Sequence, residues 1–178
     1  MPLVMARTLR PASLAWWRRR AILRMERSRA ATLALLKRLP DKEILRSKAQ
    51  GEWSIKDVLS HIAAWEEEGT ERLKLIARDQ GHRMVFYETM ADADRFNARA
   101  VAAARSTSFT GVLRRLARVR RGLVAALLRL PAKSLNDPTH ELPVVVWLRE
   151  FAWTHELAHR REIRAWWLSR RPERARRA

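Results

Sequence analysis

Two histidines near the end of the chain have the spacing of metal ligands. His155 and His159 are four residues apart, so on a helix their side chains leave the same face with Cβ atoms roughly 5–6 Å apart. Both imidazoles can then reach one ion. The same segment, with Glu156 after the first histidine, matches the HExxH pattern of zinc proteases, in which the glutamate is the general base. The spacing by itself allows both interpretations.

The protease interpretation lacks the other parts that such an enzyme needs. Besides the glutamate that acts as general base, a zinc protease requires a third metal ligand, commonly downstream on another element. The nineteen residues after His159 contain no histidine, and their acids are Glu162 and Glu173. Glu156 is expected one position away from the apolar stripe of its helix, facing solvent. We therefore do not expect protease chemistry.

A third ligand is available on a second helix. His61 lies on the inner stripe of a helix predicted from Ile55 toward Asp79, where apolar residues recur at helical spacing. Three histidines plus a water are typical of catalytic rather than structural zinc sites. Glu162, three residues after His159, could hydrogen-bond a ligating imidazole or the metal-bound water. The alternative is that no ion is bound, with His155 and His159 hydrated at the end of the bundle and His61 a core or rim histidine satisfied by other partners.

Helical periodicity accounts for most of the chain, and no sustained alternation of apolar and polar residues predicts a strand. Long helices are predicted over about residues 26–39, 55–79, from residue 108 to 130, and 144–169, with a short helix over 91–105. Ser54 is expected to cap the second long helix in a capping box with Asp57. The solvated side of that helix is marked by Glu66, Glu67, Glu68 and Glu71. We predict an all-α four-helix bundle with an extra short helix in a crossover connection.

Basic charge is concentrated at the two ends of the chain. The 178 residues carry a net charge of +18, yet residues 49–159 are nearly balanced in charge. We divide the chain into a basic extension (residues 1–24), a bundle (residues 25–171) and a basic tail (residues 172–178). The extension contains the motif Trp16-Trp17-Arg18-Arg19-Arg20. Such ends could bind an anionic membrane surface or nucleic acid, although nucleic acid is the less expected partner. The alternatives are that the ends are solvated, or that residues 1–24 pack on the bundle or form an upstream extension.

Two absences from the sequence exclude other classes of protein. No run of about 18 or more apolar residues predicts a membrane-spanning helix. The chain has no cysteine, which excludes disulfides, thiolate metal ligands and a cysteine nucleophile. This composition fits a cytoplasmic protein.

Three segments resemble the DinB-like superfamily of four-helix bundles. The segment from Gly51 to Glu66, which contains Trp53-Ser54 and His61, is similar to the loop and second helix of those proteins. The ending His155-x-x-x-His159-x-x-Glu162-Ile163-Arg164-Ala165-Trp166 is similar to their final helix. Phe96-Asn97-Ala98-Arg99, followed by a long helix that ends in Leu130-Pro131, resembles the ClbS/DfsB branch. The resemblance covers about residues 26–168.

The resemblance implies a metal triad with one histidine from the second helix and two from the fourth. By motif position these are His61, His155 and His159. The chain departs from the pattern at Glu162, where such proteins often have glutamine. Some ClbS-like members lack the triad and act without a metal. Characterised relatives include metal-dependent thiol transferases, a thiol-dependent isomerase and a self-protection hydrolase, and the resemblance also implies a homodimer.

The expected function is a divalent-metal-dependent thiol transferase or hydrolase that acts on a small electrophile in detoxification or stress response. Its partners would be a small-molecule substrate or a thiol. Imidazole ligands suit Zn, Ni and Fe alike, so the identity of the ion stays open. The predicted pocket consists of Trp65, Tyr87, Trp147 and Phe151, which suit an apolar or aromatic ligand. The alternative is a non-enzymatic bundle that sequesters a small molecule, with arginine-rich ends on anionic surfaces or nucleic acid.

Overall fold

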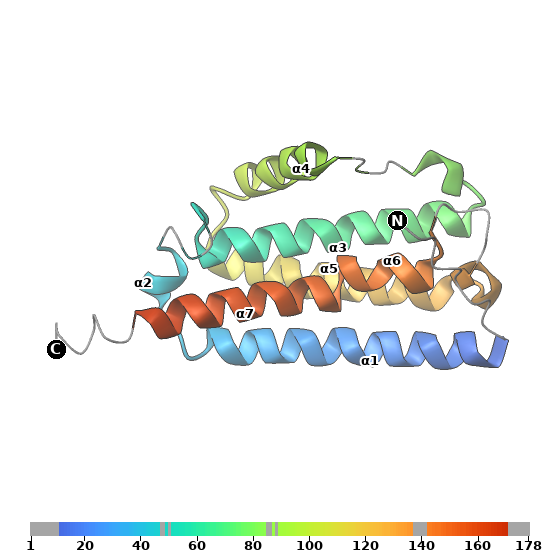
Figure 1. Cartoon of the computed structure of the whole chain (residues 1–178), viewed down its shortest axis with the longest axis horizontal. Coiled ribbons are helices and arrows are strands. Elements are labelled where there is room, and N and C mark those ends of the chain that lie inside the picture. The colour runs from blue at the N-terminus through green and yellow to red at the C-terminus, as the bar shows by residue number, and fades with distance from the viewer. Residues whose placement is uncertain are drawn as a thin grey trace.

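The structure, a computed structural model, describes residues 11–46, 49, 51–84, 87, 89–136 and 142–170. Within these residues the chain forms helices and no strand. Four long helical elements lie side by side (Figure 1). They are α1 (Pro11–Leu36), α3 (Ile55–Ala77), α5 (Phe109–Arg129), and a last element made of α6 (Val144–Phe151) and α7 (Trp153–Ser169). The predicted all-α four-helix bundle is therefore confirmed.

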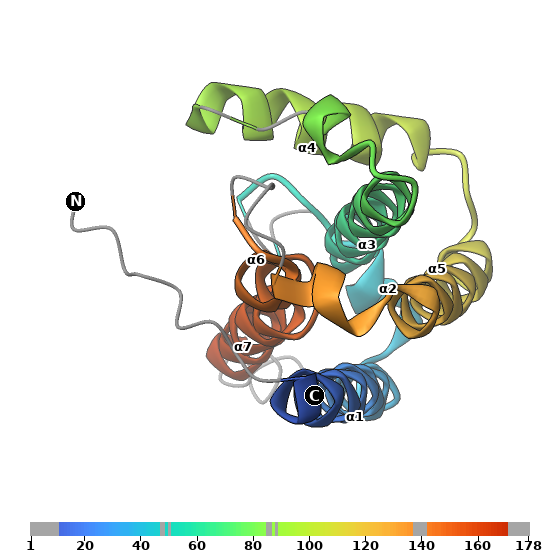
Figure 2. The same cartoon turned by 90° about the vertical axis from the view of Figure 1, so that its right-hand side faces the viewer.

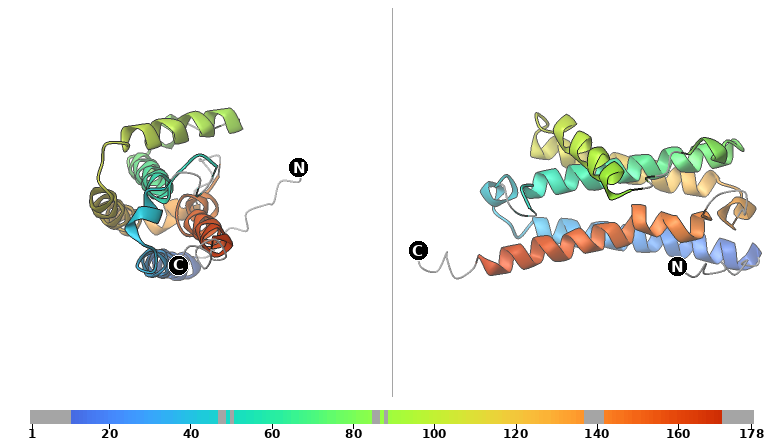
Figure 3. Two further views of the ribbon diagram at one scale, coloured as in Figure 1. Left: turned by 90° about the vertical axis from the view of Figure 1, so that its left-hand side faces the viewer. Right: turned by 45° about the horizontal axis from the view of Figure 1, so that its top comes forward.

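The extra helix of the crossover connection is α4 (Met90–Ala103). Figure 2 looks along the bundle and shows α4 running across it, outside α3, and the oblique view in Figure 3 shows the same crossing. Because α4 carries the chain back, α3 and α5 run in one direction, whereas α1 and α7 run in the other. Three short helices complete the described connections: α2 (Asp41–Ile44), η1 (Gly81–Arg83) and η2 (Ala132–Asn136).

Local sequence signals set the starts of the central helices. Asp57 Oδ2 accepts a hydrogen bond from the Ser54 backbone N–H at 2.9 Å, and Ser54 Oγ accepts one from the Asp57 N–H at 3.2 Å. This is the predicted capping box, which satisfies two backbone donors that a helix start leaves free. Thr89 and Asp92 form a second capping box at the start of α4. Ser108 caps α5 by accepting from the Gly111 N–H at 3.1 Å.

The first helix begins at Pro11, well upstream of the start near Glu26 that the periodicity predicted. Leu14, Ala21 and Met25 are all buried in the core. Their spacing of seven and four residues continues one helical stripe, which the many arginines between them obscured in the sequence. The division of the chain at residues 24 and 171 stays a prediction. Residues 1–10 and 171–178 lie outside the described residues.

The last helix was predicted to be continuous, and this prediction was wrong. The chain leaves helical geometry at Ala152, with φ −126° and ψ −99°. The carbonyl of Arg149 accepts from the Ala152 N–H at 3.2 Å and from the Thr154 hydroxyl at 2.6 Å. A side chain thus replaces a backbone donor at the break, which closes α6 and allows α7 to start again.

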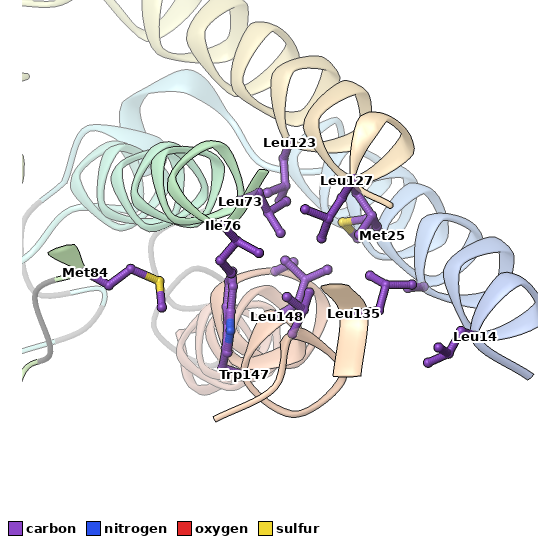
Figure 4. Packing of buried hydrophobic residues seen from close by; sticks show 14 residues of the cluster. Leu14, Met25, Leu73, Ile76, Met84, Leu123, Leu127, Leu135, Trp147 and Leu148 are labelled. Carbon is purple, nitrogen blue, oxygen red and sulfur yellow. The ribbon is translucent and has the colours of Figure 1, made fainter. Parts of the chain in front are cut away.

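Two apolar clusters form the core. The first joins residues of α1, α3, α5, η2 and α6. Figure 4 shows Leu73, Leu123, Leu127 and Leu148 close together between these elements, with Trp147 beside them. The second joins the other end of α1 and α3 to α2, the first half of α5 and Ile163 of α7. In the described part of the chain, no helix is both long and apolar enough to cross a membrane.

A buried charged network separates the two apolar clusters. Each bundle helix contributes one member: Arg29 of α1, Glu66 of α3, Arg120 of α5 and Glu156 of α7. Arg29 donates to Glu66 at 2.8 Å and to Glu156 at 2.7 Å. Arg120 contacts Glu66 and also donates to Glu156 at 2.8 Å. All four carboxylate oxygens accept from a guanidinium, so the burial of these charges is compensated.

Burial raises the pKa of Glu66, and the guanidinium groups of Arg120 and Arg29 oppose this effect. For Arg120 burial alone would lower the pKa, but the carboxylates of Glu66 and Glu156 outweigh it and raise the pKa. The geometry favours the ionised network, because charge-assisted hydrogen bonds satisfy every carboxylate oxygen.

Glu66 and Glu156 were both expected on solvated faces, and both expectations were wrong. Each side chain is 0% exposed. Their partners lie on α1 and α5, far away in the sequence, so helical periodicity within α3 or α7 gives no sign of them. The burial also removes Glu156 from any role as a protease base, because it points to the arginines.

Candidate metal centre

Three histidines from two helices converge beside the bundle core. His61 of α3 and His159 of α7 are buried, and His155 of α7 is half-buried. Nε2 of His155 lies 2.9 Å from Nε2 of His61 and 2.9 Å from Nε2 of His159. The nearest ligand atoms of all three lie within 4.8 Å of one another. One ion with bonds of about 2.0–2.1 Å to imidazole nitrogens can be reached by atoms at such separations.

Neighbouring aromatic rings hold His61 in place. The Trp53 ring packs on it with ring centroids 5.1 Å apart, and Trp65 meets it edge-on at 6.3 Å. Trp53 follows a turn in which Gly51 has φ +56°, a backbone conformation that glycine adopts without steric cost. The loop before α3 therefore supplies one wall of the site as well as the helix cap.

All three imidazoles are held neutral. Burial, with repulsion from His159, lowers the pKa of His61 to about 3, partly offset by Asn97. Burial, with repulsion from the other two histidines, lowers the pKa of His155 to about 2. Burial also lowers the pKa of His159, against the opposing effect of Glu162. Neutral imidazole is the form that ligates a metal.

The metal-free protein is expected to lose stability as the pH falls below about 6.5, the pKa of an unfolded histidine. In the folded chain the pKa of His61 is about 3 and that of His155 is about 2, so both stay neutral in mild acid. In the unfolded chain both histidines take up a proton over the same pH range. Acid therefore favours unfolding, by up to about 1.4 kcal/mol per pH unit for each histidine. Urea unfolding with a chelator at a series of pH values measures this. If the unfolding free energy of a His61→Gln/His155→Gln variant fell with pH as steeply as that of the wild type, the prediction would be contradicted.

Glu162 contacts one member of the triad. Its Oε2 lies 3.0 Å from Nδ1 of His159, which leaves Nε2 of that ring facing the other two histidines. A carboxylate in this position fixes the tautomer and orientation of a ligating histidine. The Nδ1 atoms of His61 and His155 are buried and have no hydrogen-bond partner among the described residues. Their polar contacts are therefore confined to the side where the three Nε2 atoms meet.

The donor set fits a metal ion better than a set of hydrogen bonds. A neutral imidazole presents either one N–H or one lone pair at Nε2. His155 Nε2 faces two other Nε2 atoms at hydrogen-bond distance, and a single proton there can serve only one of them. Three lone pairs directed at one ion have no such conflict.

A cavity of about 760 Å³ opens beside the triad. All four aromatic residues of the predicted pocket line it: Trp65, Tyr87, Trp147 and Phe151. The ring of Trp65 is central, with centroids 5.1 Å from both Tyr87 and Phe151 and 4.7 Å from Phe96 of α4. Such a cavity, apolar with a few polar groups, is the usual form of a small-molecule site.

Four other lining residues were not predicted from the sequence: Arg72, Asn97, Leu142 and Glu150. Asn97 Oδ1 accepts from Trp65 Nε1 at 2.9 Å, which ties α4 to the wall of the cavity. The signal for Arg72 was present, because it lies seven residues after Trp65 and so on the same side of α3. No sequence signal pointed to Leu142 or Glu150.

Comparison with known families gives a match over most of the chain. The family model described as the DinB superfamily matches residues 24–163, which include α3, α4, α5 and all three histidines. A search of curated proteins and a search of solved structures each found no match to the chain.

Proposed function

Because the chain belongs to the DinB superfamily, we propose that His61, His155 and His159 bind one divalent metal ion for chemistry on a small electrophile. The observation that carries this proposal is the convergence of the Nε2 atoms of three neutral histidines, two buried and one half-buried, at the wall of an aromatic cavity. Imidazole nitrogens favour Zn, Ni or Fe over Mg or Ca. Glu162 would orient the His159 ligand through Nδ1.

The proposed activity is thiol transfer or hydrolysis. A divalent ion there would lower the pKa of a thiol or water, which makes it a nucleophile near neutral pH. The aromatic walls around Trp65 would hold the electrophile and limit its hydration. In the transfer, the sulfur would bond to the electrophilic carbon, the thiol proton would pass to solvent, and the bond to the leaving group would break.

We also propose that the chain belongs to the ClbS/DfsB branch, with a role in detoxification or stress response. Support comes from Phe96-Asn97-Ala98-Arg99, the motif on α4 that resembles that branch. Phe96 packs on Trp65 and Asn97 lines the cavity. The motif thus contributes directly to the place where a substrate would lie.

The test is a metal and turnover measurement on the intact chain. Protein reconstituted separately with Zn²⁺, Ni²⁺ or Fe²⁺ is assayed for bound metal. It is then assayed for displacement of chloride from 1-chloro-2,4-dinitrobenzene by a small thiol, or for hydrolysis of a strained epoxide. We expect one ion per chain and turnover with at least one metal. Bound metal and turnover should both be lost in His61→Ala. Both should be kept in His82→Ala, a matched control at an exposed histidine of η1.

Two outcomes would contradict the proposal. Unchanged metal content in His61→Ala would remove that histidine from the site. Retention of a hydrophobic ligand without turnover of any electrophile would favour the alternative, a sequestering bundle.

A further inference from the structure

The motif Trp16-Trp17-Arg18-Arg19-Arg20 is divided between the inside and the outside of α1. Trp17 packs against the first core cluster. The Arg18 guanidinium donates to the Leu128 carbonyl at 3.4 Å and to the carbonyl of Leu130, at the end of α5. Trp16, Arg19 and Arg20 are exposed. Packing of the bundle therefore explains two of the five residues, and the other three face outward.

The outward residues belong to a longer stripe, which we call the α1 surface. Its members are Trp16, Arg20, Leu23, Arg24 and Arg27, with Trp153 of α7 beside them. Positions 16, 20, 23, 24 and 27 share one face of a helix. Trp16 is 55% exposed and Leu23 is 42% exposed, although both are large and apolar.

Cations and tryptophans are in contact on this surface. The Arg20 guanidinium lies 5.4 Å from the centre of the Trp16 ring, and that of Arg24 lies 5.9 Å from the Trp153 ring. The whole of α1 contains six arginines and one acid, Glu26. The surface therefore combines positive charge with exposed aromatic and aliphatic groups along the outside of the bundle.

We propose that the α1 surface docks on an anionic lipid bilayer. A helix with arginines on its polar flank and Trp or Leu between them lies in the interface, where its apolar side chains enter the headgroup region. Tryptophan is enriched at that depth of the membrane, and anionic lipids attract nearby arginines. Nucleic acid would match the positive charge through its phosphates but would leave Trp16 and Leu23 without a partner.

Docking in this way would leave the cavity accessible. Figure 2 shows α1 and α4 on opposite sides of the bundle. The described residues that line the cavity come from α3, α4, α6, α7 and the connections, and none of them belongs to α1. The inference is thus independent of whether the histidines bind a metal.

Sedimentation of the full chain with lipid vesicles tests the proposal. The vesicles are phosphatidylcholine, either alone or with about one-third phosphatidylglycerol as the anionic lipid. The triple variant Arg20→Gln/Arg24→Gln/Arg27→Gln should bind the anionic vesicles about a hundredfold more weakly, since each arginine near the surface contributes about fivefold. Trp16→Ala/Leu23→Ala should weaken binding roughly tenfold, and this loss should persist at high salt because it is apolar.

The matched control removes the same charge from another helix. Arg114, Arg118 and Arg121 are exposed on α5, and replacing all three with glutamine should change vesicle binding less than about fivefold. Circular dichroism melts would verify that each variant is folded, and His61→Ala should bind vesicles as the wild type does. Equal losses in the α1 and α5 variants would overturn the proposal. So would binding to duplex DNA without binding to anionic vesicles.

Discussion

Replacing His155 with alanine is expected to weaken the binding of a divalent ion by about a hundredfold or more. His155 is the central member of the triad, because its Nε2 lies 2.9 Å from Nε2 of both His61 and His159. Structural zinc sites gain roughly 10–16 kcal/mol from four ligands, which is about 3 kcal/mol for each. Competition with a chromophoric chelator measures the dissociation constant of both proteins.

Stability gives a second measurement of the same effect. A metal at a thousand times its dissociation constant should raise the free energy of unfolding of the wild type by about 4 kcal/mol. At the same metal concentration His155→Ala should gain far less, and His82→Ala should behave as the wild type does. Equal affinities in His155→Ala and the wild type would exclude His155 as a ligand.

Replacing Glu66 with leucine is expected to lower the free energy of unfolding by about 3–5 kcal/mol. The change leaves Arg29 and Arg120 buried with Glu156 as the remaining carboxylate of the network. An uncompensated buried charge is far more costly than a lost surface ion pair. Urea unfolding at neutral pH measures the difference.

Two comparisons separate the network from a general loss of charge. Glu71 forms an exposed pair with Lys74, and Glu71→Leu should cost less than about 1 kcal/mol. Replacing all four network residues with apolar ones should restore most of the stability, since buried ion networks often exchange for apolar packing without loss. If Glu66→Leu lowered the free energy of unfolding by no more than Glu71→Leu does, the four buried charges of the network would not depend on one another.

Much of the fold was predictable because its signals are local. The Ser54–Asp57 capping box and the apolar periodicity act within a few residues of one another, and they predicted helices close to α3, α4 and α5. The same periodicity failed at Ala152, where the Thr154 hydroxyl competes with the backbone for the Arg149 carbonyl. It also failed at the start of α1, where buried Leu14 and Ala21 are spaced among arginines.

The candidate site was predictable in part. The i,i+4 spacing of His155 and His159 is a local signal, whereas the link to His61 rested on a shared inner stripe and on the family resemblance. The structure brings those three side chains together beside Trp65, Tyr87, Trp147 and Phe151. Their roles as metal ligands and pocket residues stay predictions that the proposed experiments test.

The sequence by itself determined the helices, the inner stripes and the histidines that could share an ion, because these depend on spacing along one chain segment. Only the tertiary structure decided where the charges of Glu66 and Glu156 go. Helical periodicity places a residue relative to its own helix, but whether a carboxylate there meets water or a guanidinium depends on the neighbouring helices. In this bundle Arg29 of α1 and Arg120 of α5 converge on both carboxylates. Two acids expected at the surface are therefore buried between the helices.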